Sequence, residues 1–545
     1  MEKRIFTNTK KFLHIPIKDD NPSVGKYIKV YDGEKLVHEF YLNVAFGNVE
    51  PDFYVALNLA NYKESEVTFV CEYQDANGIF DGFIYGDTPE KQKDLYPNLY
   101  KEPSRQQIHF SSRRGWMNDL NGLFYKDGKY NVYFQHNPFG SRNGFINVSW
   151  GHAITTDLVH YEEYPDAIMP ISSRCFIASG SSYVDNNNFF GKGKGAIISA
   201  CTYLQSHQYN GRPKITQDEG QNLYYSTDNG MTFTRFDFSP IIPVPDGYDW
   251  RDPKIFEHNG KIYILVFEPV SEEPSTSFYV TEDGKNWKKV SSGEKFHECP
   301  DFFELDVVNA DEKFYVMYGG NGKYSIGTFE NFKFTAIEQD LYLDYGGWNS
   351  IYAGQTFCNY PSTKKRVYLA WLVDSNMRCT YLEGQGYGVE GFNSSMSLAT
   401  ELSLVKTKLG YRVLRKPIDE LLSLRKDSFE FEFKKSQLLK TPCEYVFTLS
   451  DEDVTFTIRD ESFTYNAKER KIISNTRYHK EYQFITAGEI KVRMFADTKS
   501  IEFFMADEIS LTYYADTRIQ ELKVESSKPL KAIVYNLKSI WENKI

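Results

Sequence analysis

The stretch that decides the fold is Gly115-Trp116-Met117-Asn118-Asp119-Leu120-Asn121-Gly122, and it leads into the aromatic run Leu123-Phe124-Tyr125. Asp127-Gly128 then separates this run from a second one at residues 130–135. Two strand-forming runs joined through Asp-Gly predict a β-hairpin, because this dipeptide supplies the positive φ of a tight primed turn. Asp119 is therefore expected just before the first strand. A carboxylate beside amide groups and an indole ring suits a sugar, although the same residues also fit a polar loop with Asx turns.

Two later segments repeat this setting. Arg251-Asp252-Pro253 precedes the apolar run at residues 254–256, and Glu298-Cys299-Pro300 precedes the run at residues 302–305. Proline cannot donate to a strand ladder and restricts the residue before it to extended conformations, so both tripeptides predict places where the chain turns into a strand. Three carboxylates at the beginnings of three strands indicate repeated units that face a common centre.

The ordered set Trp-Met-Asn-Asp-x-Asn-Gly, Arg-Asp-Pro and Glu-Cys-Pro resembles glycoside hydrolase family 32, which contains the invertases, inulinases and levanases that cleave β-fructofuranosidic bonds. Each short motif alone is a weak signal, whereas the order of all three is specific. Further matches to the family lie at residues 134–138, 150–153, 352–357, 396–398, 416–421 and 501–504. The resemblance implies a five-bladed β-propeller with its active site in a central funnel, followed by a C-terminal β-sandwich.

The chain has 545 residues, which is too many for one hydrophobic core, and the expected fold class is all-β with three domains. Residues 1–102 carry short alternating runs that predict an N-terminal β-sandwich-like accessory domain. Residues 103–415 are a succession of short strands. Two similar segments in this region start at residues 226 and 280, a 54-residue spacing that fits one four-stranded blade. Residues 416–545 begin with a short helical segment and then alternate as strands, which predicts the C-terminal β-sandwich.

Roughly 310 residues at about 50 to 60 per blade allow five or six blades, and the resemblance implies five. The residues of the N-terminal domain do not indicate its role. A structural support for the propeller is favoured over a carbohydrate-binding module, because no cluster of exposed aromatic residues can be recognised.

The resemblance implies that Asp119 is the nucleophile, that Glu298 is the general acid/base, and that Asp252 accepts hydrogen bonds from fructosyl hydroxyls. Retention of configuration is expected if the first two carboxyls lie about 5 Å apart. To act as an acid, Glu298 must hold a proton near neutral pH, so its pKa is expected to be raised by burial and by the nearby anions while Asp119 stays ionised. Arg251 is expected to offset part of the negative charge of the three carboxylates. Taken singly, each carboxylate also fits a salt bridge or a strand end.

The same resemblance assigns substrate binding to Asn118, Gln135, Trp150, Ser179 and Arg251. For Trp150 a position in the core is an equal alternative. The chain departs from the family pattern at four positions. Leu120 stands where Pro is usual, Phe145 where Trp is usual, Ala178 where Phe is usual, and Phe392 where Trp is usual. These departures leave the linkage preference and the chain-length preference open.

The expected function is a retaining β-fructofuranosidase that acts on fructans, fructooligosaccharides or sucrose, with exo action favoured. An endo-levanase and a fructosyltransferase stay open because no residue separates them. A catalytically silent fructan-binding protein is the alternative from a different class. No metal or organic cofactor is expected, and the seven cysteines have no zinc-ligand spacing.

The composition of the chain argues against some classes of binding partner. The net charge of −11 argues against nucleic acid and anionic membranes, which need concentrated Lys and Arg, so the expected partner is a fructose-containing oligo- or polysaccharide. No apolar run is long enough to span a membrane, and residues 1–13 lack the apolar core of a signal peptide. A cytoplasmic location is therefore expected, or a periplasmic or secreted one if a leader has been removed. The oligomeric state is not indicated.

Overall fold

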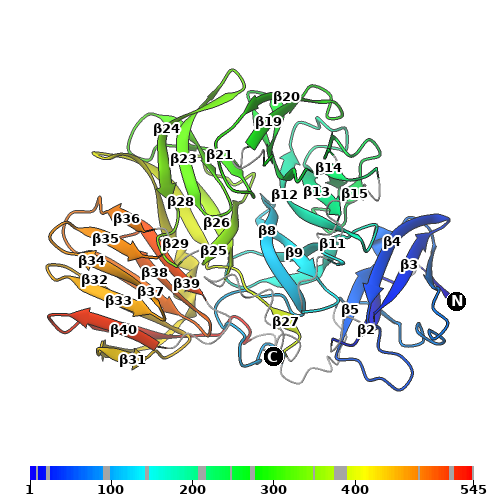
Figure 1. Cartoon of the computed structure of the whole chain (residues 1–545), viewed down its shortest axis with the longest axis horizontal. Coiled ribbons are helices and arrows are strands. Elements are labelled where there is room, and N and C mark those ends of the chain that lie inside the picture. Colours follow the sequence, from blue (N-terminus) through cyan, green and yellow to red (C-terminus); the bar gives the residue numbers. More distant parts are fainter. Residues whose placement is uncertain are drawn as a thin grey trace.

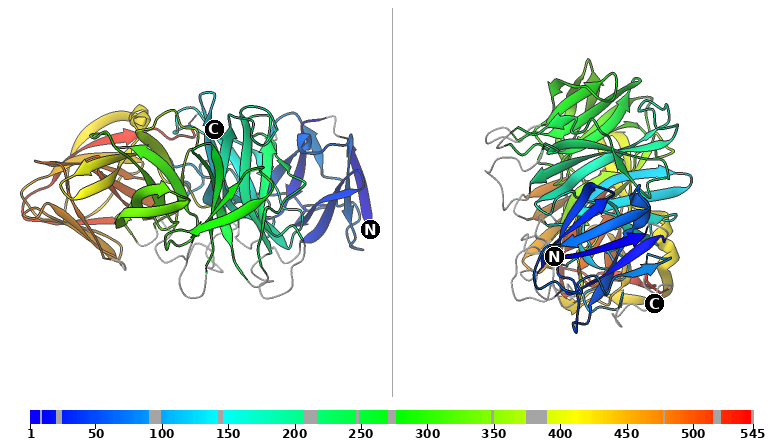
Figure 2. Two further views of the ribbon diagram at one scale, coloured as in Figure 1. Left: turned by 90° about the horizontal axis from the view of Figure 1, so that it is seen from above. Right: turned by 90° about the vertical axis from the view of Figure 1, so that its right-hand side faces the viewer.

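The computed structural model describes residues 1–7, 10–19, 25–89, 99–141, 146–205, 217–245, 248–269, 276–347, 350–373, 390–476, 479–514 and 521–542. Regular structure in these ranges is almost entirely β-strand, with short 3-10 helices at Leu59–Asn61 and Asp419–Leu424. The all-β prediction is confirmed. The strands form three bodies that lie in a row, with the N-terminal sheets at one end and the C-terminal sheets at the other (Figures 1 and 2).

The N-terminal body contains two packed sheets. The first has the order β1 (Glu2–Thr7), β6 (Glu66–Cys71), β3 (Lys26–Asp32) and β4 (Lys35–Leu42), and the second has the order β5 (Phe53–Asn58), β2 (Phe12–Ile17) and β7 (Ile84–Gly86). Phe6, Phe40 and Phe69 are buried in one hydrophobic cluster with residues of the second sheet. Phe139 from the central body joins this cluster, with its ring centroid 5.2 Å from that of Phe40. The two bodies therefore share part of a core.

The central body is built from five sheets that follow one another along the chain. The first sheet contains β8 (Gly115–Lys126), β9 (Lys129–Asn137), β10 (Ser149–Thr155) and β11 (Glu162–Ile168), and the second contains β12 (Cys175–Asp185), β13 (Ala196–Gln205), β14 (Gly220–Ser226), β15 (Thr234–Arg235) and β16 (Ile242–Pro243). The third contains β17 (Arg251–His258), β18 (Lys261–Phe267), β19 (Thr276–Thr281) and β20 (Trp287–Ser292), and the fourth contains β21 (Asp301–Asp306), β22 (Lys313–Tyr318), β23 (Lys323–Glu330) and β24 (Lys333–Tyr342). The fifth contains β25 (Ile351–Thr356), β26 (Lys365–Leu372), β28 (Thr400–Thr407) and β29 (Gly410–Pro417). A short strand, β27 (Phe392–Asn393), pairs in parallel with β8.

The first strands of these sheets contact one another in a closed cycle, from β8 to β12, β17, β21, β25 and back to β8. The backbone N–H of Cys358, just after β25, closes the cycle by donating to the Leu123 carbonyl in β8 at 3.0 Å. Five sequential sheets arranged as a ring form a five-bladed β-propeller, as the resemblance implies. The fifth sheet runs to Pro417, so it extends past residue 415; the three domain boundaries stay predictions.

The hairpin between β8 and β9 has the predicted turn. Asp127 (φ 51°) and Gly128 (φ 77°) both adopt positive φ, as a primed turn requires. The position expected for Asp119 was wrong in one respect, because β8 already begins at Gly115 and includes this residue. Asn118 and Asp119 together lie opposite one residue of β9, so they form a β-bulge inside the strand.

Three other inner strands carry the same register shift near their first residues. The inserted pairs are Ala178-Ser179 in β12, Asp252-Pro253 in β17 and Ala353-Gly354 in β25. A bulge re-aims side chains that would otherwise alternate across the sheet. The active-site candidates therefore lie at the same end of the propeller, where the inner strands begin.

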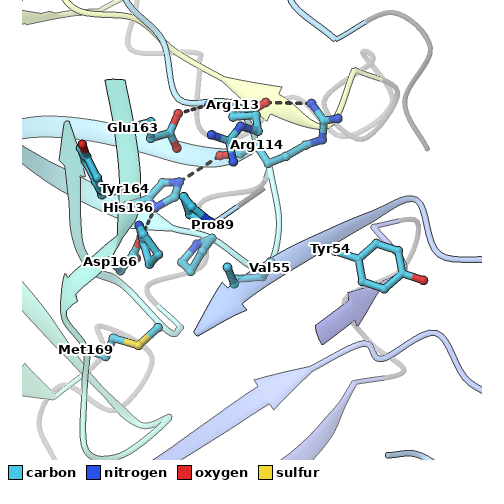
Figure 3. A pocket seen from close by; sticks show the side chains of 13 residues that line it. Tyr54, Val55, Pro89, Arg113, Arg114, His136, Glu163, Tyr164, Asp166 and Met169 are labelled. Atoms are coloured by element: carbon cyan, nitrogen blue, oxygen red, sulfur yellow. Dashed lines mark hydrogen bonds and ion pairs between the residues drawn. The ribbon is translucent and has the colours of Figure 1, made fainter. Parts of the chain in front are cut away.

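The N-terminal body docks against loops at this end. The Asn147 amide bonds both backbone groups of Tyr41, and the backbone N–H of Glu39 donates to the Ile171 carbonyl at 2.9 Å. Between the two bodies lies a pocket that is lined by Val55 of β5 and, from the first blade, by the paired side chains of His136 and Asp166 (Figure 3). The docking thus combines shared apolar packing with directed hydrogen bonds.

The C-terminal body is a sandwich of two six-stranded sheets. Their orders are β30 (Arg425–Glu432), β41 (Lys531–Leu537), β32 (Cys443–Leu449), β37 (Ile490–Ala496), β38 (Ser500–Met505) and β39 (Ile509–Tyr514), and β31 (Ser436–Leu438), β40 (Glu521–Ser526), β33 (Val454–Ile458), β34 (Glu461–Asn466), β35 (Lys471–Asn475) and β36 (Lys480–Gln483). Buried His109 connects this body to the propeller through Asp497 at 2.8 Å and Glu502 at 2.7 Å. Burial opposes its protonation, but these two partners outweigh burial and raise the pKa of His109 to about 9.

Candidate active site

Asp119, Asp252 and Glu298 come together at the end of the propeller where the inner strands begin. Asp119 lies in the bulge of β8, Asp252 in the bulge of β17, and Glu298 three residues before β21. Cys299 connects them, because its Sγ atom lies 3.4 Å from Oδ2 of Asp119 and 3.4 Å from Oδ2 of Asp252. The three carboxylates predicted from the sequence therefore form one cluster.

Asp119 is held by hydroxyl and amide donors. The Ser179 hydroxyl donates to Oδ2 at 2.7 Å, and Nδ2 of Asn118 lies 3.4 Å from Oδ1. Burial, followed by the nearby Glu298 carboxylate, raises the pKa of Asp119 to about 6, although the Ser179 hydrogen bond opposes the rise. At neutral pH the group is ionised and oriented, as a nucleophile requires.

Asp252 is the most enclosed of the three, with 5% of the residue exposed. Its backbone N–H donates to Oγ1 of Thr202 at 2.9 Å, and its Oδ2 accepts the backbone N–H of Cys299 at 2.9 Å. Burial raises its pKa to about 7; the Arg251 guanidinium opposes this shift, and the anions Glu298 and Asp119 add to it. Asp252 therefore holds a proton more readily than an ordinary aspartate, and its enclosed carboxyl suits hydrogen bonding to a ligand.

The pKa of Glu298 is shifted in the direction opposite to the one expected from the sequence. The Arg251 guanidinium donates to Oε2, with Nε at 3.1 Å, and the Tyr352 hydroxyl donates to Oε1. Burial alone would raise its pKa, but Arg251 foremost, together with His297 and Tyr352, outweighs burial and holds the pKa of Glu298 below its ordinary value. The expectation that Glu298 carries a raised pKa is wrong for the free protein, because two donors converge on Glu298.

Arg251 balances much of the charge in the cluster. Besides Glu298, it pairs with Asp249 and lies 3.6 Å from Oδ2 of Asp252. Its guanidinium also lies over the Phe267 ring, 4.9 Å from the centroid. Burial would lower its pKa, but the three carboxylates outweigh burial and raise it, so the predicted charge-tempering role is matched by the geometry.

The other predicted substrate residues lie at different depths. Asn118 is half-buried at the cluster, whereas Ser179 faces Asp119. Gln135 is buried, and its Nε2 donates to the Ile177 carbonyl at 2.8 Å. Trp150 is 0% exposed, and its indole N–H donates to the Ala178 carbonyl at 3.0 Å. The burial of Trp150 favours the core position that the sequence left open, with the indole N–H bonded to β12.

Three residues of the cluster were not assigned a role from the sequence. Cys299 contacts two carboxylates, Tyr352 contacts Glu298, and Thr202 accepts the Asp252 backbone N–H. Tyr352 lies in a matched family segment at residues 352–357, which was the one signal for it. Burial, then Asp252 and Asp119, raises the pKa of the Cys299 thiol well above its usual range, so the group is a protonated donor at neutral pH.

Within the described ranges, no group of three or more His, Cys, Asp or Glu side chains is placed to hold a metal ion. In the same part of the chain, no helix has the length and apolar character needed to cross a membrane.

A family model described as "Glycosyl hydrolases family 32 N-terminal domain" matches residues 109–417, more than half of the chain. Levanase of Bacillus subtilis (strain 168) is 32% identical over 355 residues, which cover 60% of this chain and 49% of the levanase. Invertase 2 of Saccharomyces cerevisiae is 32% identical over 321 residues, which cover 55% of this chain and 58% of the invertase. The aligned part thus spans about half the length of these relatives.

Solved structures share the fold. Exo-inulinase from Aspergillus awamori superposes with a TM-score of 0.66 at 22% identity, covering 81% of this chain and 100% of that chain. Fructofuranosidase from Schwanniomyces occidentalis complexed with fructose has a TM-score of 0.63 at 22% identity, covering 81% of this chain and 99% of that chain.

Proposed function

The chain belongs to glycosyl hydrolase family 32, and from this membership and the carboxylate cluster we propose that it hydrolyses β-fructofuranosidic bonds in fructans, fructooligosaccharides or sucrose, by exo action. The observation that carries the proposal is the convergence of Asp119, Asp252 and Glu298 around Cys299. Each comes from a different blade, and each carboxylate accepts a hydrogen bond from a residue outside its own blade: Asp119 from Ser179, Asp252 from the Cys299 backbone N–H, and Glu298 from Arg251.

In this proposal Asp119 attacks the anomeric carbon of the fructosyl unit. The new bond forms between an Asp119 oxygen and that carbon as the bond to the departing oxygen breaks, and Glu298 gives its proton to that oxygen. Water then attacks the glycosyl-enzyme, gives its proton to Glu298 and frees Asp119. Asp252 hydrogen-bonds fructosyl hydroxyls while these steps take place.

Glu298 has to gain a proton before it can act as the acid. We infer that substrate brings this about: a sugar that covers Glu298 and takes over the donors of Arg251 and Tyr352 removes the contacts that lower the pKa of Glu298 in the free protein. Arg251 keeps Asp249 and Asp252 as partners during this change.

The test is a product profile after separate incubations with sucrose, inulin and levan. Free fructose as the sole early product supports exo-hydrolysis, and the preferred polymer identifies the linkage. A ladder of shorter oligosaccharides would indicate an endo enzyme, and products longer than the substrate would indicate a fructosyltransferase. Asp119→Ala and Glu298→Gln are each expected to lower the rate by orders of magnitude.

A catalytically silent fructan-binding protein is the second candidate, because the Arg251 pair keeps Glu298 ionised in the free protein. It predicts that no substrate is turned over, and that Glu298→Gln binds fructan as tightly as the unaltered chain. Measurable fructose release that disappears in Glu298→Gln would exclude it.

A further inference from the structure

A hollow that opens to solvent lies where the N-terminal body meets the propeller. Its N-terminal side is lined by Tyr27, Lys29, Glu39, Val70, Glu72 and Tyr73, and Arg174 lines it from the propeller. We refer to these seven residues as the N-terminal groove. None of them belongs to the carboxylate cluster.

The groove residues form neighbouring rows on one face of the first sheet. Lys29 of β3 is in register with Glu39 of β4 on one side and Val70 of β6 on the other. Tyr27 of β3 is 36% exposed, and its ring packs against that of Tyr41 with centroids 5.0 Å apart. The sheet itself thus sets the spacing of the groove.

The chemistry of the groove suits a neutral, hydroxyl-rich ligand. Lys29 donates to Oε2 of Glu72 at 3.1 Å, and Glu39 accepts from the Ser173 hydroxyl at 2.9 Å. Two cationic and two anionic side chains balance, so the groove offers donors and acceptors without the charge excess that an ionic ligand needs. Tyr27 and Tyr73 add aromatic faces of the kind on which sugar rings pack.

The groove lies at the same end of the propeller as the carboxylates. Arg174 immediately precedes β12, and Ser179 of that strand donates to Asp119. Five extended residues span about 17 Å, a distance that an oligosaccharide of several rings can bridge. The bond from Glu39 to the Ile171 carbonyl fixes the sheet to the loop that carries Arg174.

We propose that the N-terminal groove binds a distal part of a fructan chain while the end of that chain occupies the carboxylate cluster. This inference rests on the proposed function for the identity of the sugar. It assigns the N-terminal domain a role in holding polymeric substrate, so short substrates gain nothing from it.

The test is affinity electrophoresis of the full chain through gels that contain levan, inulin or dextran, in a Glu298→Gln background so that the polymer is not degraded. Retardation by a fructan is expected, and Tyr27→Ala and Arg174→Ala are each expected to weaken it by about tenfold in Kd, the size of one aromatic or charged contact. Tyr85→Ala is the matched control, since Tyr85 is 38% exposed on β7 of the other sheet. Equal retardation of all variants, no retardation by either fructan, or retardation by dextran alone would overturn the proposal.

The active chain provides an independent readout. Tyr27→Ala is expected to raise KM for the preferred polymer by about tenfold while kcat/KM for sucrose stays the same. Unchanged KM for the polymer in a chain that hydrolyses sucrose would refute the groove and leave the proposed function intact. Absent turnover with groove-dependent retardation would refute the proposed function and leave the groove intact.

Discussion

Replacing Tyr352 by Phe removes the hydroxyl that donates to Oε1 of Glu298 and keeps the ring. A hydrogen bond to a charged group contributes about 1.5–3 kcal/mol. The Glu298 side chain is 22% exposed, so water replaces part of this interaction, and a loss of about 1.4 kcal/mol is expected, which equals one unit of pKa. Because the lost donor favours the ionised carboxylate, the pKa of Glu298 should rise.

The sign of the effect on activity follows from which carboxyl holds the proton. In the free protein the pKa of Asp119 is raised to about 6 and that of Glu298 is lowered. If the reactive form needs Asp119 ionised and Glu298 protonated, the acidic limb of kcat/KM against pH reports the lower pKa and the basic limb the upper one. Tyr352→Phe should therefore move the acidic limb upward by about one pH unit and leave the basic limb in place.

The assay is fructose release from sucrose, measured as kcat/KM from roughly pH 3 to pH 9. Tyr318→Phe is the matched control, since it removes a buried hydroxyl that donates to the Asp301 carboxylate at 2.8 Å outside the cluster. A stationary or lowered acidic limb in folded Tyr352→Phe would refute the reasoning, as would an equal shift in the control.

Three further outcomes are expected. The raised pKa of His109 contributes stability that is fully present below about pH 6.5 and is lost as the pH rises through about 9. Thermal unfolding should show that the free energy of unfolding falls by on the order of 3 kcal/mol across this pH window in the unaltered chain but not in His109→Asn. An equal pH dependence of this free energy in the two proteins would contradict the prediction. Asp301→Ala leaves buried Lys254, whose Nζ lies 2.5 Å from the carboxylate, without this partner; denaturant titration should show a loss of about 3–5 kcal/mol, and an unchanged midpoint would argue against the pair. Trp150→Phe should lower the unfolding midpoint by an amount equivalent to about 1–3 kcal/mol with KM for sucrose unchanged, whereas a raised KM at unchanged stability would restore a sugar contact.

Much of the architecture could be predicted because its signals are local. The Asp127-Gly128 turn requires only the backbone preferences of two residues, and the structure has the positive φ values that they predict. The ordered motifs around Asp119, Asp252 and Glu298 predicted a common centre, and the ring of inner strands brings the three together. Even so, residues 118 and 119 form a bulge within β8, because pairing with β9 continues on both sides of them.

Signals that depend on packing were not visible in the sequence. Trp150 has the same indole whether it binds a sugar or supports a strand, and only its burial against Ala178 decides between the two. The N-terminal groove also escaped prediction, since Tyr27 and Tyr73 belong to separate segments and Arg174 to another body. Register between strands, which no single run specifies, brings these side chains together.

The sequence by itself determined the succession of short strands, the turns between them and the chemical identity of the three carboxylates, because these follow from residue type and order. The tertiary structure alone decided the order of the pKa values of Asp119 and Glu298. Arg251 and Tyr352 lie far from Glu298 along the chain, yet both donate to it, and they reverse the pKa order expected from the motif. The physical reason is that electrostatic energies depend on distance and burial in space, and folding sets both.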